Sequence, residues 1–202
     1  MKDRRGNRIA LVLVAAAVGL VVASALFDLP KRLLASERIA ALAPQIRASA
    51  AEFDLDPYLV AAVVDAESSG RVDAVSRVGA LGLMQLKLET ARERARLLGI
   101  VRVDESALLS DPALNLRLGC AYLRHLLDRF GDEDPRPALI AYNAGPSKVA
   151  KWFDEAGGFE PWLAAQDAAA PAQPGSVRHY ARKILATQER FRARALLGEP
   201  VD

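Results

Sequence analysis

The chain contains 202 residues, 51% of them hydrophobic and 26% charged, and its formal net charge is +2. That length, less an apolar N-terminal stretch, predicts one globular domain with a buried core. The four basic residues and one acidic residue within residues 1–27 account for the positive balance, and the other charges are mixed in sign, which argues against a nucleic-acid partner.

The first expected element, residues 1–30, is a membrane or targeting segment. A basic tip precedes an uncharged apolar run from Ile9 to Phe27. Basic flanks stay in the cytosol, and the run approaches the roughly 20 residues that span a bilayer. Ala23-Ser24-Ala25 also resembles the cleavage site of a signal peptide. A transmembrane anchor and a cleaved signal both remain open, with the anchor preferred because Lys31-Arg32 follow closely. Either places the rest of the chain in the cell envelope, on the periplasmic or extracytoplasmic face.

Residues 35–197 predict one almost wholly helical domain. The expected helices are residues 37–53, 57–68, 89–98, 111–130, 136–144, 146–156 and 176–196. Short strands can form around residues 71–78, but no pattern there requires a sheet. The fold class is therefore all-α, or α+β with minimal strand. Residues 157–174 are rich in Gly, Ala and Pro and are expected to form a long loop or a partly ordered insertion.

Glu67 lies at the end of the expected helix 57–68, on the same stripe as several apolar residues. Residues three and four apart share a helix face, which places its carboxyl beside Val63 and Val64. Desolvation disfavours the charged form of a carboxyl, so we expect the pKa of Glu67 to be raised and the group to act as a proton donor. By itself such a glutamate could equally be structural.

The loop that follows Glu67 has the composition of a binding site. Gly70, Gly79 and Gly82 allow tight turns, while Ser76 and Gln85 supply short polar groups of the kind that orient a polar ligand. Each glycine taken singly is better explained as a loop turn. Their grouping around one acid predicts a site.

Two motifs in this order resemble the catalytic domain of the soluble lytic transglycosylases, a lysozyme-like family related to goose-type lysozymes. The first motif is Glu67-Ser68, Ser76, Gly79-Ala80, Gly82-Leu83-Met84-Gln85 and Thr90-Ala91. The second is Ala141-Tyr142-Asn143-Ala144-Gly145-Pro146, and Asp111-Pro112, Asn115, Gly119 and Tyr122-Leu123 match the helix between them. The resemblance covers residues 35–197 and implies a lysozyme-like helical domain. The apolar run from Ile9 to Phe27 predicts one hydrophobic helix before that domain.

The resemblance also implies the roles of individual residues. Glu67 would be the acid and base, and the substrate, peptidoglycan glycan strands, would be bound by Ser76, Gln85, Tyr142, Asn143, Arg178 and Tyr180. No cofactor is implied. No metal site is expected either, because Cys120 is alone in an apolar helical segment and the two histidines are scattered. Trp152 and Phe153 are expected in the core, whereas Trp162 could also stack on a sugar ring.

Three positions depart from the family pattern. Lys87-Leu88 stands where the family usually has methionine and proline, Ser176 replaces a glutamate, and Gly70 replaces a bulky residue. These departures bear on the glycan subsites more than on the reaction.

The number of carboxyls indicates the mechanism. Ordinary glycoside hydrolysis uses two carboxyl groups, but the loop between Asp73 and Glu89 contains no acid and Asp65 projects from another face of the helix than Glu67. The resemblance implies that the N-acetyl group of the substrate assists instead, so that the bond between N-acetylmuramic acid and N-acetylglucosamine is cleaved without water and a 1,6-anhydro end forms. The alternatives are a lysozyme-like muramidase and a catalytically idle peptidoglycan-binding module of an envelope machine.

Overall fold

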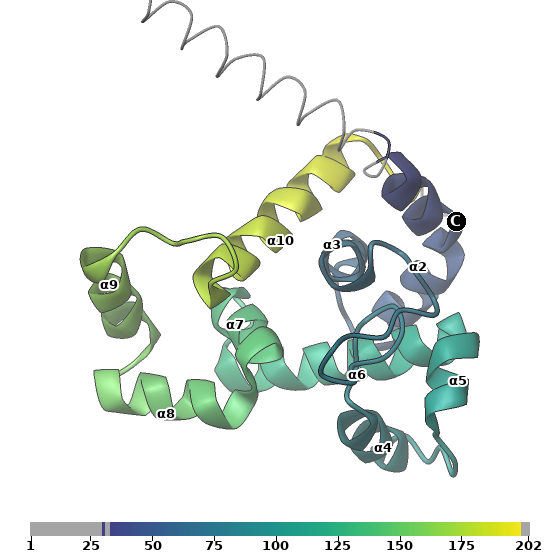
Figure 1. Cartoon of the computed structure of the whole chain (residues 1–202), viewed down its shortest axis with the longest axis horizontal. Coiled ribbons are helices and arrows are strands. Elements are labelled where there is room, and N and C mark those ends of the chain that lie inside the picture. The colour runs from purple at the N-terminus through teal and green to yellow at the C-terminus, as the bar shows by residue number, and fades with distance from the viewer. Residues whose placement is uncertain (1–29, 31–32, 199–202) are drawn as a thin grey trace, which may run out of the picture.

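A computed structural model of the chain describes residues 30 and 33–198 (Figure 1). The segment 1–30, expected to be an anchor or a signal, therefore lies outside the described residues except for its last residue. Among the helices that are described, none combines the length and the apolar character needed to cross a bilayer.

The described part of the chain is helical and contains no strand, which confirms the all-α expectation. The helices are α2 (Ala43–Glu52), α3 (Pro57–Ser68), α4 (Leu88–Leu97), α5 (Glu105–Ser110), α6 (Pro112–Phe130), α7 (Arg136–Ala144), α8 (Pro146–Ala156), α9 (Phe159–Ala169) and α10 (Val177–Ala193). Instead of the short strands considered for this region, the structure has two isolated β-bridges, Val75 to Leu81 and Leu81 to Leu86.

Several helices begin where the sequence predicts, because a capping side chain precedes a proline. The carboxylate of Asp56 accepts a hydrogen bond from the Tyr58 N–H at 2.8 Å at the start of α3. The carboxylate of Asp111 does the same for the Leu114 N–H at 3.0 Å at the start of α6. Proline has no backbone N–H, and an N–H in the first turn would have no partner within the helix, so proline fits such a start.

The expected helix 37–53 is wrong as a single element. Residues 33–41 are helical, Leu42 forms a turn, and α2 starts at Ala43. Pro44 explains the break, because a proline at the beginning of α2 has no N–H with which to continue the preceding helix. α5 has no counterpart among the expected helices.

The expected loop over residues 157–174 is also wrong, because α9 occupies most of it. Gly157 and Gly158 have φ angles of 81° and 130°, and they turn the chain between α8 and α9. Pro161 lies in the first turn of α9, where a backbone N–H has no partner within the helix.

Aromatic packing holds α9 against α8. The rings of Phe159 and Trp162 each lie 5.4 Å from that of Phe153, and Trp162 stacks on Trp152 at 5.8 Å. Phe153 is buried, as expected for a core residue, and Trp162 is only 7% exposed. Trp162 is therefore a packing residue of this helix pair.

α6 is the central helix of the fold. It packs against α2, α4, α5 and α7, while α10 packs on α3 and α7, and α8 and α9 extend to one side (Figure 1). The buried side chains form a large cluster and a small one. α6 contributes Leu116, Cys120 and Leu123 to the large cluster and Leu118 to the small one. Cys120 is buried as predicted, and burial raises the pKa of its thiol.

Candidate active site

Glu67 lies in the last turn of α3, and its side chain is half-buried. The helix ends just beyond it, because Ser69 takes a left-handed conformation with φ 55° and its N–H bonds the Asp65 carbonyl at 3.1 Å. Burial raises the pKa of the Glu67 carboxyl above its ordinary value, in agreement with the expectation. A hydrogen bond from Tyr180 and the positive charge of Lys183 act in the opposite direction and lower that pKa.

Two tyrosines from other helices lie around this carboxyl. The Tyr180 hydroxyl, on α10, donates a hydrogen bond to Glu67 Oε1. The Tyr142 hydroxyl, on α7, donates to the Met84 carbonyl at 2.7 Å. Burial raises the pKa of both phenols, and the negative charge of Glu67 raises each of them further. The side chain bonded to the acid is thus Tyr180, which the resemblance implied only as a glycan-binding residue.

The loop between α3 and α4, residues 70–87, is here called the site loop. The Ser76 hydroxyl accepts a hydrogen bond from the Ala80 N–H at 2.9 Å. The Gln85 amide nitrogen donates to the Ala74 carbonyl at 3.0 Å and to the Gly82 carbonyl at 2.9 Å. Both amide hydrogens of Gln85 are therefore used to shape the site loop, and its carbonyl oxygen is the group left to accept a bond from a ligand.

The site loop is fixed to α6 by Asn115, a fully buried residue whose structural role the sequence does not reveal. Its side-chain oxygen accepts from the Met84 N–H at 2.9 Å. Its nitrogen donates to the carbonyls of Leu81 and Leu108, each at 3.1 Å. A Cβ at Gly82 would lie 2.1 Å from that nitrogen, so only glycine fits where the site loop meets α6.

The three departures from the family pattern have local structural partners. The Lys87 ammonium donates to the Val78 carbonyl across the site loop. The Ser176 hydroxyl caps α10 by accepting from the backbone N–H three residues later, at 3.2 Å. A Cβ at Gly70 would lie 2.8 Å from the Cβ of Arg38, so the N-terminal helical segment occupies the space of a larger side chain.

The two remaining candidate residues have different surroundings. Asn143 is exposed near the end of α7. Arg178 is buried, and its guanidinium donates to the Asp167 carboxylate and to the Ala170 carbonyl, which ties α10 to the end of α9. The glycan-binding role that the resemblance implies for Arg178 stays a prediction, since this partner set is structural.

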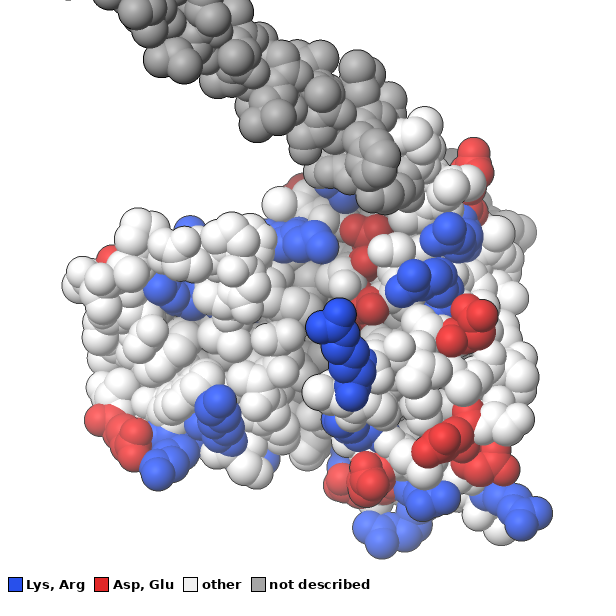
Figure 2. Space-filling view, viewed as in Figure 1, with Lys and Arg blue, Asp and Glu red and all other residues white. Residues whose placement is uncertain are grey.

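The surface around these elements is uneven in shape and charge. In the space-filling view it is hollowed between the α8–α9 end and the part built on α3 and α6, and charged side chains of both signs lie along the hollow (Figure 2). Over the described residues, no group of three or more His, Cys, Asp or Glu side chains is placed to hold a metal ion. The groups that act on the Glu67 carboxyl are the phenol of Tyr180 and the ammonium group of Lys183.

Comparison with protein families and with known sequences gives consistent matches. Residues 44–164 match the family described as the transglycosylase SLT domain. The transglycosylase of Enterobacteria phage PRD1 is 44% identical over 107 residues, covering 53% of this chain and 36% of that protein. The membrane-bound lytic murein transglycosylase C of Histophilus somni (strain 2336) is 34% identical over 117 residues, covering 54% of this chain and 32% of that protein. The chain thus matches about a third of the length of each of these relatives.

Solved structures with a similar fold come from the same group of proteins. An inactive mutant of the lytic transglycosylase Slt from Pseudomonas aeruginosa superposes with a TM-score of 0.63 at 30% identity, covering 79% of this chain and 25% of that chain. The 70 kDa soluble lytic transglycosylase from Escherichia coli gives a TM-score of 0.61 at 25% identity, covering 75% and 24%. The family match extends over more than half of the sequence and includes Glu67 and Tyr142. This chain belongs to the transglycosylase SLT domain family.

Proposed function

We propose that the chain is a peptidoglycan lytic transglycosylase, an enzyme that cleaves the β-1,4 bond between N-acetylmuramic acid and N-acetylglucosamine and leaves a 1,6-anhydro end. The observation that carries the proposal is the half-buried Glu67. Burial raises the pKa of its carboxyl, and the carboxyl also accepts a hydrogen bond from Tyr180. A carboxyl whose pKa is raised keeps its proton to higher pH, and such a group is suited to protonate a leaving oxygen.

The proposed reaction has two steps and consumes no water. Glu67 first gives its proton to the glycosidic oxygen, the bond from that oxygen to the anomeric carbon of the muramic acid breaks, and the acetamido oxygen of the same sugar bonds to that carbon. The Glu67 carboxylate then takes the proton of the sugar's 6-hydroxyl, and this oxygen displaces the acetamido oxygen. The carboxyl regains its proton, so Glu67 alone serves as acid and base.

The charges near Glu67 support a mechanism with one carboxyl. The charged side chain that acts on its pKa is a cation, Lys183, which stabilises the carboxylate formed between the two steps. Asp65 is two residues earlier on α3, and its carboxylate lies 3.9 Å from a guanidinium nitrogen of Arg190. Ordinary glycosidases, which add water, use a second carboxyl across the scissile bond from the first.

The proposed substrate contacts come from the site loop and from α7 and α10. The glycan would be bound by Ser76, Gln85 and Asn143. Tyr142 would bind it close to the Glu67 carboxyl. Tyr180 has a further proposed role, because its hydrogen bond keeps the Glu67 carboxyl oriented and lowers its pKa. Without that bond the carboxyl would hold its proton more tightly and would release it less readily to the leaving oxygen.

The proposed location is the cell envelope, on the outer side of the inner membrane, with residues 1–30 as an anchor. The basic tip followed by an apolar run supports this orientation, and one relative is a membrane-bound enzyme by name. Membrane fractions washed with alkaline carbonate test it: an anchored chain stays in the pellet at full length, whereas a cleaved chain appears in the wash, shortened by its signal.

Digestion of purified sacculi with mass spectrometry of the products tests the activity. The expected products carry anhydro ends, one water lighter than the reducing ends that a muramidase releases. Glu67→Gln should release no product, whereas Glu133→Gln, which changes an exposed glutamate of the same type, should act as the parent chain does. Reducing ends, binding to sacculi without soluble product, or product release by Glu67→Gln would each refute the proposal.

A further inference from the structure

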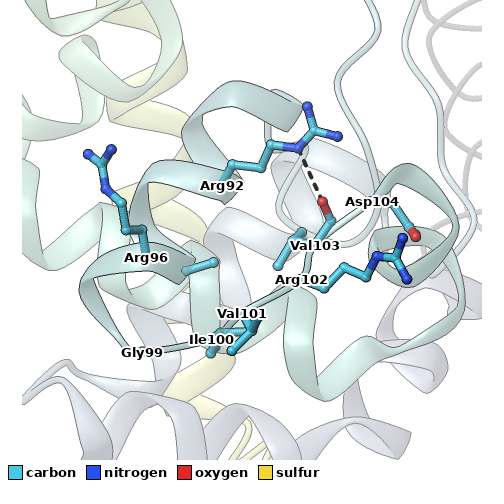
Figure 3. Close-up of a pocket in the computed structure, with 9 residues that line it drawn as sticks. Arg92, Arg96, Gly99, Ile100, Val101, Arg102, Val103 and Asp104 are labelled. Atoms are coloured by element: carbon cyan, nitrogen blue, oxygen red, sulfur yellow. Dashed lines mark hydrogen bonds between the residues drawn. The ribbon is translucent and has the colours of Figure 1, made fainter.

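A second concave site lies away from the residues just described. A cavity of about 690 Å³ opens between α4 and the segment that leads to α5, and neither Glu67 nor the two tyrosines line it. Arg92 and Arg96 extend from successive turns of α4, and Arg102 extends from the following segment (Figure 3). Its volume is within the range of cavities that bind small ligands.

The charges of this cavity are not balanced within the protein. Among the residues described, none of Arg92, Arg96 and Arg102 takes part in an ion pair; the Arg92 side chain donates one bond, to the Val103 carbonyl at 3.2 Å. Asp104 is the one acid among the lining residues, and its carboxylate already accepts from the Ala107 N–H at 2.9 Å as the cap of α5. Like charges one helical turn apart repel, so an anion in the cavity would relieve that repulsion.

The cavity also has apolar walls. Ala95 and Val103 are buried, Ile100 is half-buried, and all three line it. Its favoured ligand therefore carries negative charge next to small apolar groups. Guanidinium groups bind carboxylates through paired hydrogen bonds. The peptides attached to the muramic acid units of peptidoglycan have this chemistry, because they combine free carboxylates with alanine methyl groups.

The cavity and the site loop are parts of one unit. Ala95 and Val103 belong to the small hydrophobic cluster, together with Leu81 and Leu86 of the site loop. α4 itself begins directly after that loop, with Lys87 as its cap. A ligand held in the cavity would thus contact elements that pack directly against the site loop. A glycan strand carries many peptides, so one strand can supply both the bond to be cut and a carboxylate for this cavity.

We infer that the Arg92–Arg96–Arg102 cavity binds carboxylates of the peptides carried by the glycan strand, and so selects peptide-bearing strands. This inference rests on the proposed function for its ligand. It assigns to α4 and the segment after it a binding role separate from that of the residues around Glu67.

The test measures binding of a free stem tetrapeptide, released from sacculi by an amidase, to the full chain in detergent. Arg96→Gln and Arg102→Gln should each weaken the binding roughly threefold to tenfold, the effect of losing one hydrogen bond at a partly open site. The matched control is Arg194→Gln, which removes one exposed positive charge outside the cavity; it should leave the dissociation constant unchanged. Equal melting temperatures of the variants would show that all of them fold.

Two further measurements separate this inference from the proposed activity. Glu67→Gln should bind the tetrapeptide as the parent chain does, because the acid does not line the cavity. On sacculi, Arg96→Gln should release product more slowly than Arg194→Gln. Binding that is equal in all variants, absence of tetrapeptide binding, or equally tight binding of inorganic phosphate at the same ionic strength would overturn the inference. The mass of the sacculus products would still decide the proposed activity.

Discussion

Replacement of Asn115 by alanine should destabilise the domain strongly, because this side chain satisfies three backbone groups. The substitution would leave the Met84 N–H and the carbonyls of Leu81 and Leu108 without these partners. The residue is 0% exposed, and an unpaired buried polar group costs roughly 1–3 kcal/mol. At the lower end of that range for each group, we expect a loss of about 3 kcal/mol, a large part of the 5–15 kcal/mol typical of a domain.

Urea denaturation at neutral pH measures this loss, and hydrogen exchange locates it. The Met84 amide should exchange much faster in Asn115→Ala, because its acceptor has been removed. Asn143→Ala is the matched control for stability, since Asn143 is exposed, and should change the free energy of unfolding by less than about 0.5 kcal/mol. A loss below about 1 kcal/mol in Asn115→Ala, with the Met84 amide still protected, would refute the role assigned to Asn115.

Three more predictions concern the same region. Because the pKa of Glu67 is raised in the folded chain, the free energy of unfolding should fall as the pH rises from the pKa of this carboxyl in the unfolded chain to its pKa in the folded chain. Urea titrations of Glu67→Gln should lack this fall. The variant should be more stable than the parent chain above that pH interval and equally stable below it. Tyr180→Phe removes the bond that lowers the pKa of Glu67, so the alkaline limb of the activity profile should move to higher pH; an unmoved limb would contradict the assignment. Gly119→Ala would place a Cβ 2.2 Å from the Met84 sulfur, and thermal denaturation should show a loss of roughly 1–3 kcal/mol.

Helices with clear start and stop signals could be predicted from the sequence, and those without them could not. α3 and α6 begin at an aspartate followed by proline, and the structure confirms both starts. α5 is six residues long, too short to show an apolar period; its one local signal is Asp104, which caps it. α9 follows two glycines and contains a proline, a composition typical of loops. Its formation depends on aromatic contacts with α8, which local sequence does not encode.

The surroundings of Glu67 on its own helix could be predicted from the sequence, but its contacts with other helices could not. The apolar neighbours of Glu67 on α3 correctly indicate a desolvated carboxyl with a raised pKa. Its hydrogen-bond partner, Tyr180, is 113 residues away and is brought to it by the packing of α10 on α3. The charge of Lys183, one helical turn further along α10, acts on the same carboxyl and lowers its pKa. Such long-range contacts follow from the tertiary fold, so periodicity and capping signals give no information about them.

α6 contributes side chains to both hydrophobic clusters. The two clusters therefore pack against the same helix, and neither can separate from α6 without exposing part of its buried surface. Separating the small cluster would expose the surface of α6 on which the site loop rests, through Asn115 and Leu118. The site loop and α3, which carries Glu67, are therefore both joined to the folded core through α6.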